Sequence, residues 1–201
     1  MDDGLNNTAN AEVNGDFSRE WARSLQDRRH RFALTGTFDT PWWFGKLRLS
    51  PRFRYGTAAL FNLGDGGSDR NLDDLGTDRV NFSGNLADIR YREPGSPIPT
   101  ELLAQFSLQK IGEKSGNLPR NAGTAPSFYT LDLSVTREWR FHERYKLRPV
   151  VQFDNILNAA VFNYGSAFID LAVTPAAQNN FLVPTRTYRQ RQIRLGMRFD
   201  F

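Results

Sequence analysis

Strict alternation of apolar and polar residues at the end of the chain constrains its fold more than any other feature. From Ile193 to Phe201 every odd-numbered residue is apolar, and from Gln192 to Asp200 the even-numbered residues are polar, apart from Gly196. Side chains of a β-strand point alternately to its two faces. The pattern therefore predicts a strand of about ten residues with one apolar and one hydrated face.

Four earlier segments show the same alternation, so we predict five long strands, at about residues 29–39, 46–56, 128–141, 146–155 and 188–201. A strand of about ten residues rises roughly 33 Å, or about 23 Å when tilted by 45°. This length matches the apolar band of an outer-membrane barrel, which is about 25 Å tall. Strands of soluble sandwiches are shorter, at about five or six residues. The fold class expected is all-β, an antiparallel transmembrane β-barrel segment.

The connections between these strands alternate between short and long. Residues 40–45 and 142–145 are short links, whereas residues 56–128 and 156–188 are long. Outer-membrane barrels have short periplasmic turns and long extracellular loops. We expect the long connections, and residues 1–28 as the end of a preceding loop, to be extracellular. Aromatic residues near the short links and the C-terminus would form an interfacial girdle of Trp42, Trp43, Phe44, Trp139, Phe141, Tyr145 and Phe201.

Composition excludes a helical membrane protein but not a barrel. No uncharged stretch reaches the roughly 18 apolar residues of a spanning helix, and the stretch 156–169 is also interrupted by polar residues. The mean hydropathy of −0.54 is that of a polar chain. A strand with one apolar and one hydrated face averages to polar, so this value does not argue against a membrane. A soluble β-sandwich binding module stays open as an alternative.

Four segments, in chain order, carry a family resemblance: residues 28–36 (RRHRFALTG), 118–124 (LPRNAGT), 153–158 (FDNILN) and 191–201 (RQIRLGMRFDF). Together they resemble the C-terminal part of TonB-dependent outer-membrane receptors of the Oar-like type, which carry a carboxypeptidase-regulatory-like N-terminal domain. The resemblance covers nearly the whole chain. It implies that the five strands, residues 29–201, are the last part of a barrel of roughly 22 strands, and that this chain is a fragment of a longer product.

The resemblance also implies a location, partners and a function. The location would be the outer membrane of a Gram-negative-type bacterium, with membrane lipid around the barrel. The barrel-assembly machinery would read the C-terminal strand that ends in Phe201, and the TonB complex would engage only a plug and TonB box that are absent here. The expected function is active uptake of a large nutrient or chelate. A passive porin-like protein and a structural or adhesive barrel are the alternatives.

No catalytic, cofactor or metal site is predicted, and we expect the protein not to be an enzyme. The chain has no cysteine and only two histidines, and it lacks a nucleophile motif. In the loop 65–78, Asp69, Asn71 and Asp73 have the spacing of a calcium loop. However, Asp74 stands where that loop needs glycine and Val80 where it needs glutamate. An EF-hand is excluded, and calcium binding by this loop is left open.

The chain carries 26 basic and 22 acidic residues, for a net charge of +4. Its basic residues occupy alternate positions of several strands and form no compact cluster with aromatic residues, so we expect no nucleic-acid partner. On the hydrated faces they would point into the lumen, where they hydrate it or pair with a plug domain or with anionic solutes. These residues are Arg48, Arg52, Arg54, Arg194 and Arg198.

Overall fold

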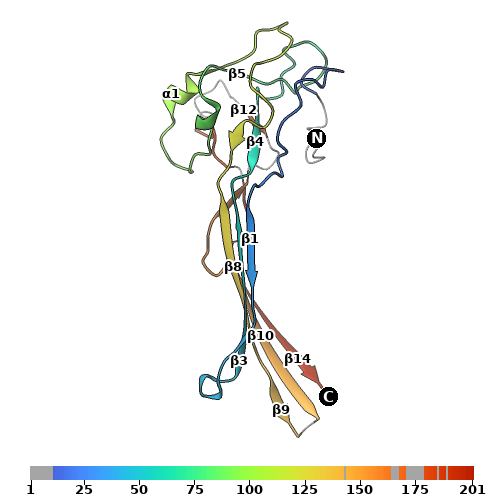
Figure 1. The fold of residues 1–201 in the computed structure, drawn as a ribbon, viewed down its shortest axis with the longest axis vertical. Helices are drawn as coiled ribbons and strands as arrows, with labels where there is room; N and C mark the ends of the chain where they lie inside the picture. The colour runs from blue at the N-terminus through green and yellow to red at the C-terminus, as the bar shows by residue number, and fades with distance from the viewer. Residues whose placement is uncertain (1–10, 143, 164–167, 171–178, 185, 189) are drawn as a thin grey trace. The chain divides into compact units, whose positions relative to one another are not determined.

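The computed structural model (Figure 1) describes residues 11–142, 144–163, 168–170, 179–184, 186–188 and 190–201. The predictions for residues 1–10 and 189, and the parts of the expected links 142–145 and 156–188 that fall on residues 143, 164–167, 171–178 and 185, lie outside these residues. Contacts divide the chain into two compact units. The strand unit comprises Arg29–Thr57, Ser127–Val161 and Thr187–Phe201. The loop unit comprises Met1–Arg28, Ala58–Pro126 and Phe162–Arg186.

The strand unit is built around one antiparallel sheet, in the order β1-β3-β8-β10-β14, with the short strands β2 and β9 paired to β3 and β10. Its strands are β1 (Arg31–Thr35), β2 (Phe38–Asp39), β3 (Leu47–Gly56), β8 (Phe128–Arg137), β9 (Trp139–Phe141), β10 (Tyr145–Asp154) and β14 (Gln192–Asp200). A 3₁₀ turn, η1 (Trp42–Phe44), lies between β2 and β3. Within the described residues β1 and β14 are edge strands, so the sheet does not close into a barrel.

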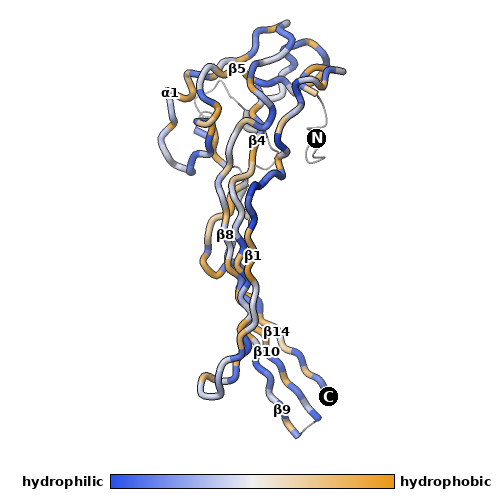
Figure 2. The backbone as a smooth tube through the Cα atoms, viewed as in Figure 1, coloured by the Kyte–Doolittle hydropathy of each residue, from blue (hydrophilic) through white to orange (hydrophobic). Residues whose placement is uncertain are grey.

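The register aligns the alternating residues of all the long strands. One cross-strand row is Leu49, Val135, Val151 and Leu195, and the next row on the same face is Pro51, Leu133, Phe153 and Ile193. The row between them, on the opposite face, is Ser50, Ser134, Gln152 and Arg194. Hydropathy accordingly alternates along the strands in Figure 2. The sheet therefore has one continuous apolar face and one continuous polar face.

Of the expected strands, 188–201 is shorter than predicted, because β14 begins at Gln192. Two other ranges expected to be single strands are each interrupted opposite a proline. The range 29–39 divides into β1 and β2 at Gly36, whose N–H donates to the carbonyl of Pro51 (3.3 Å). The range 128–141 divides into β8 and β9 where, by the register on either side, the chain lies opposite Pro149. A proline has no N–H to donate to its partner strand, so one ladder bond is missing at each place.

The loop unit contains short elements: β4 (Leu60–Gly64), β5 (Asn81–Phe82), η2 (Leu86–Asp88), α1 (Thr100–Leu103), β6 (Phe106–Ser107), β7 (Gly123–Thr124) and β12 (Phe168–Asp170). β11 (Val161–Asn163) and β13 (Arg186–Tyr188) pair with each other. Buried residues of the loop unit form an apolar core that includes Phe61, Leu63, Val80, Ile89 and Leu118. None of the helices among the described residues is long and apolar enough to cross a membrane.

Adjacent substitutions in β10 test the assignment of the two faces. Arginine at Val151 would place a charge on the apolar face, and a lipid-facing arginine near mid-membrane costs about 2–4 kcal/mol. Arginine at Val150, the matched control, adds the same side chain to the polar face, opposite the uncharged Thr136 and Gly196. We expect Val151→Arg to lower the folded, heat-modifiable fraction in a urea titration and Val150→Arg to leave it near wild type. Equal effects of the two substitutions would contradict the assignment.

Candidate functional site: the two faces of the wall

The apolar face of the sheet is uncovered along its edge strands. Side chains that are more than half exposed include Phe32 and Leu34 on β1, and Ile193, Leu195, Met197 and Phe199 on β14. Soluble monomers rarely expose contiguous apolar patches larger than a few hundred Å². Surface of this kind, on strands long enough to cross hydrocarbon, is what a lipid-facing wall requires.

Aromatic residues gather at the end of the sheet where the short links lie. All seven aromatic residues of the expected girdle are exposed there, and Phe201 is 84% exposed. The ring of Phe199 stacks on those of Tyr145 and Phe201, at centroid distances of 6.0 and 6.1 Å. Arg137 breaks the alternation of β8, but its guanidinium lies 5.2 Å from the Trp139 ring centroid. A cation–π contact lets this charge sit among the aromatic residues.

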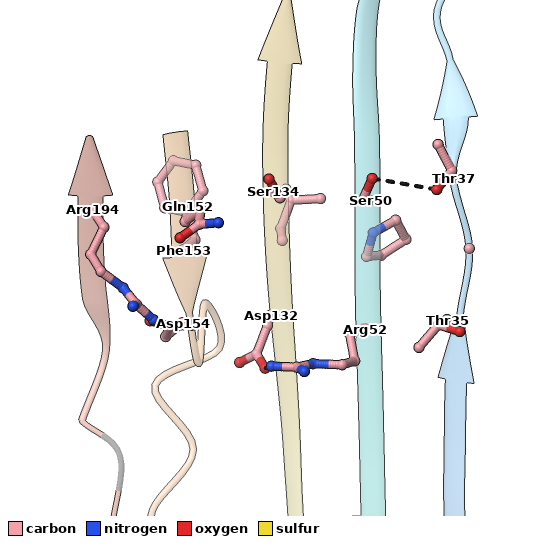
Figure 3. Close-up of a pocket in the computed structure, with 13 residues that line it drawn as sticks. Thr35, Thr37, Ser50, Arg52, Asp132, Ser134, Gln152, Phe153, Asp154 and Arg194 are labelled. Carbon is pink, nitrogen blue, oxygen red and sulfur yellow. Dashed lines mark hydrogen bonds and ion pairs between the residues drawn. The ribbon is translucent and has the colours of Figure 1, made fainter. Parts of the chain in front are cut away.

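The polar face carries ion pairs between strands (Figure 3). Asp132 on β8 accepts hydrogen bonds from Arg52 (2.9 Å) and Arg54 (3.0 Å) on β3. Arg194 on β14 pairs with Asp154 on β10. These pairs cross from one strand to the next, so they fix the register as well as neutralising charge.

Further ion pairs lie at the turn end of the same face. Arg48 donates to Asp39 through two nitrogens, at 2.8 and 3.1 Å, and Arg198 donates to Asp200 at 2.9 Å. All five arginines expected on the lumenal side therefore lie on the polar face, and each has a carboxylate partner in the strand unit. The prediction was that these arginines hydrate the lumen or pair with a plug domain or with solutes, and it did not name these carboxylates. Four of the arginines find their partner on a neighbouring strand, and Arg198 finds it two residues further along its own strand.

The FDNILN segment forms a tight exit from β10. The backbone N–H of Asn155 donates to Asp132 (2.9 Å), and its side chain exchanges two hydrogen bonds with the backbone of Ala159. Asn155 and Asn158 both adopt positive φ, which asparagine tolerates better than most residues. The Asn158 side chain accepts a hydrogen bond from the N–H of Arg191, just before β14 (3.3 Å).

A buried ion network in the loop unit was not predicted. Glu12 and Arg79 are almost fully buried, and an N–H of the Arg79 guanidinium donates to Glu12 at 2.7 Å. Glu20 accepts from Arg79 (3.0 Å) and from Arg120 (2.9 Å). Burial would raise the pKa of Glu20, but the guanidinium groups overcome that effect and the pKa is lowered. Partners so far apart in sequence leave no local pattern that could have revealed the network.

The carboxylates of the acidic loop 65–78 are used within the loop itself. Asp65, Asp69, Asp73 and Asp78 each accept hydrogen bonds from backbone N–H groups of the loop. Asp74 adopts the positive φ (67°) that a glycine would favour there, and Val80 lies in the core. Burial raises the pKa of Asp78. No cluster of three acidic or histidine side chains suited to a metal is found among the described residues.

Two-faced strands, exposed apolar residues and a charged inner face define a wall segment of an outer-membrane β-barrel. Residues 1–194 match a family model described as an outer membrane beta barrel domain, and the chain belongs to this family. This family places the protein in the outer membrane of Gram-negative bacteria, and its members are typically not enzymes. No curated protein and no solved structure matches the chain.

Substitution of Arg79 tests the buried ion network. Arg79→Met would leave Glu12 and Glu20 without their shared buried cation, and breaking a buried pair in this way costs about 3–5 kcal/mol. We expect faster amide hydrogen exchange in the loop unit and unchanged exchange in the strand unit. Arg90→Met is the control, because Arg90 is exposed and its guanidinium donates to the Ala87 carbonyl of the same turn. Exchange in Arg79→Met as slow as in the control would contradict a stabilising role.

Proposed function

We propose that this chain is the C-terminal barrel portion of an Oar-like, TonB-dependent outer-membrane receptor for active uptake of a large nutrient or chelate. Its own part is passive: it supplies barrel wall, extracellular loops and an assembly signal. Energy would enter through a plug and a TonB box on another part of the receptor. The proposed role is transport, without catalysis.

The observation that carries this proposal is an open, register-matched sheet with long connections at only one end. Backbone groups on the free edges of β1 and β14 need partners in lipid, so the sheet supports a larger barrel. The resembling segments also occupy structural positions in that sheet. FDNILN forms the exit of β10 and holds the approach to β14, and the final segment is β14 itself.

Conductance distinguishes a plugged receptor from a passive pore. The full-length receptor, reconstituted into planar bilayers, is expected to show no steady conductance until urea displaces its plug. In cells, a mutant without the receptor gene and a mutant without TonB should both fail to grow on the same member of a panel of large nutrients and chelates. Steady conductance without urea would favour the porin-like alternative. No shared growth defect would overturn TonB-dependent uptake and leave a structural or adhesive role.

The barrel-assembly machinery is the second partner that we propose, through the strand that ends in Phe201. Phe201→Ala is expected to lower the amount of full-length protein in the outer membrane several-fold, as measured by fractionation and heat-modifiability. Phe17→Ala is the matched control, because Phe17 is also exposed but lies in the loop unit. Wild-type levels of the Phe201→Ala protein would refute a role for this residue in assembly.

A further inference from the structure

Positive charge is concentrated in the strand unit. This unit contains 15 basic and 6 acidic residues, whereas the loop unit contains 11 basic and 16 acidic ones. The modest net charge of the chain therefore conceals a wall that is strongly basic. Since charged residues are excluded from the lipid side of such a wall, most of this charge faces the lumen.

At the turn end of the polar face, cations outnumber carboxylates by two to one. The cations are Lys46, Arg48, Arg140, Lys146, Arg148 and Arg198, and the carboxylates are Asp39, Glu138 and Asp200. Most of these residues line or adjoin one hollow in the strand unit. Each carboxylate is already engaged by arginine: for example, Glu138 accepts from Arg140 (2.6 Å) and Arg148 (2.7 Å). The excess charge is therefore not neutralised among the described residues.

The register also sets like charges directly opposite each other. Lys146 pairs with Arg140 across β9 and β10, and Arg148 pairs with Arg198 across β10 and β14. One carboxylate, Asp200, lies opposite Lys146 and is shared between Arg148 (3.4 Å) and Arg198 (2.9 Å). Like charges in opposed positions destabilise a sheet. A bound anion would remove this repulsion, and exposed guanidinium groups are shaped for two-point contact with phosphate or carboxylate. Arg140 and Arg198 have side chains that are 68% and 71% exposed.

From this arrangement we infer that the turn end of the lumenal face is a binding site for a multivalent oxyanion solute that carries phosphate or carboxylate groups. This inference rests on the proposed transport function and names a chemical class of solute for it. The charge excess is largest at the turn end, where six cations face three carboxylates, whereas in the middle of the sheet Arg52, Arg54 and Arg194 face Asp132 and Asp154. An excess concentrated at one end matches a small anion better than an acidic domain filling the lumen, which would need complementary charge along the whole face.

Calorimetry with inorganic pyrophosphate tests the site on the full-length receptor in detergent. We expect saturable binding that weakens as salt is raised. The double variant Arg140→Gln/Lys146→Gln should bind about tenfold or more weakly, because it removes charge-assisted hydrogen bonds. Lys110→Gln/Arg90→Gln, which removes the same charge from the loop unit, should bind as wild type does.

Two results would overturn the inference: no binding by wild type, or equal binding by both variants. Absence of binding by wild type would point to an acidic domain as the occupant. Binding to the solubilised receptor needs neither TonB nor an energised membrane. Absent binding with intact TonB-dependent uptake would therefore overturn the oxyanion site alone. Binding without TonB-dependent uptake would overturn the transport function alone.

Discussion

The rest of the structure depends on one requirement of the membrane: every backbone N–H and C=O group in hydrocarbon must be hydrogen-bonded, while the side chains facing lipid must be apolar. The antiparallel register meets both conditions together. It pairs β3 with β8 over ten residues, β10 with β14 over nine and β8 with β10 over four, and it brings residues such as Leu49, Val135, Val151 and Leu195 to the same face. A shift of one residue in any strand would turn its charged side chains toward lipid.

Charge on the opposite face has two consequences. In the middle of the sheet, arginines on β3 and β14 pair with Asp132 on β8 and Asp154 on β10, so side chains as well as backbone link β3 to β8 and β14 to β10. At the turn end the same alternation places Lys146 opposite Arg140 and Arg148 opposite Arg198. The ion pairs in the middle therefore support the register of the strands, whereas the excess of cations at the turn end gives the positive field that we propose selects a solute.

Much of the strand unit could be predicted from sequence, because the face of a strand is set by local alternation. The arginines from Arg48 to Arg198 were assigned to the polar face on this basis alone. The breaks opposite Pro51 and Pro149 were not predicted, because a missing N–H matters only once the partner strand is known. The structure of the loop unit was harder to predict from sequence than that of the strand unit. Its central ion pair joins Glu12 to Arg79, and no periodic pattern links residues so far apart.

The most direct test of the two-faced wall uses spin labels, since the chain has no native cysteine to remove. Single cysteines would be placed at successive positions from Leu147 to Phe153 on β10 in the full-length protein in lipid. Accessibility to oxygen and to a nickel chelate would then be measured at each label. The account predicts a period of two, with odd-numbered positions exposed to oxygen in lipid and even-numbered positions exposed to the chelate in the lumen. Accessibility without this alternation, or with the two faces exchanged, would contradict it.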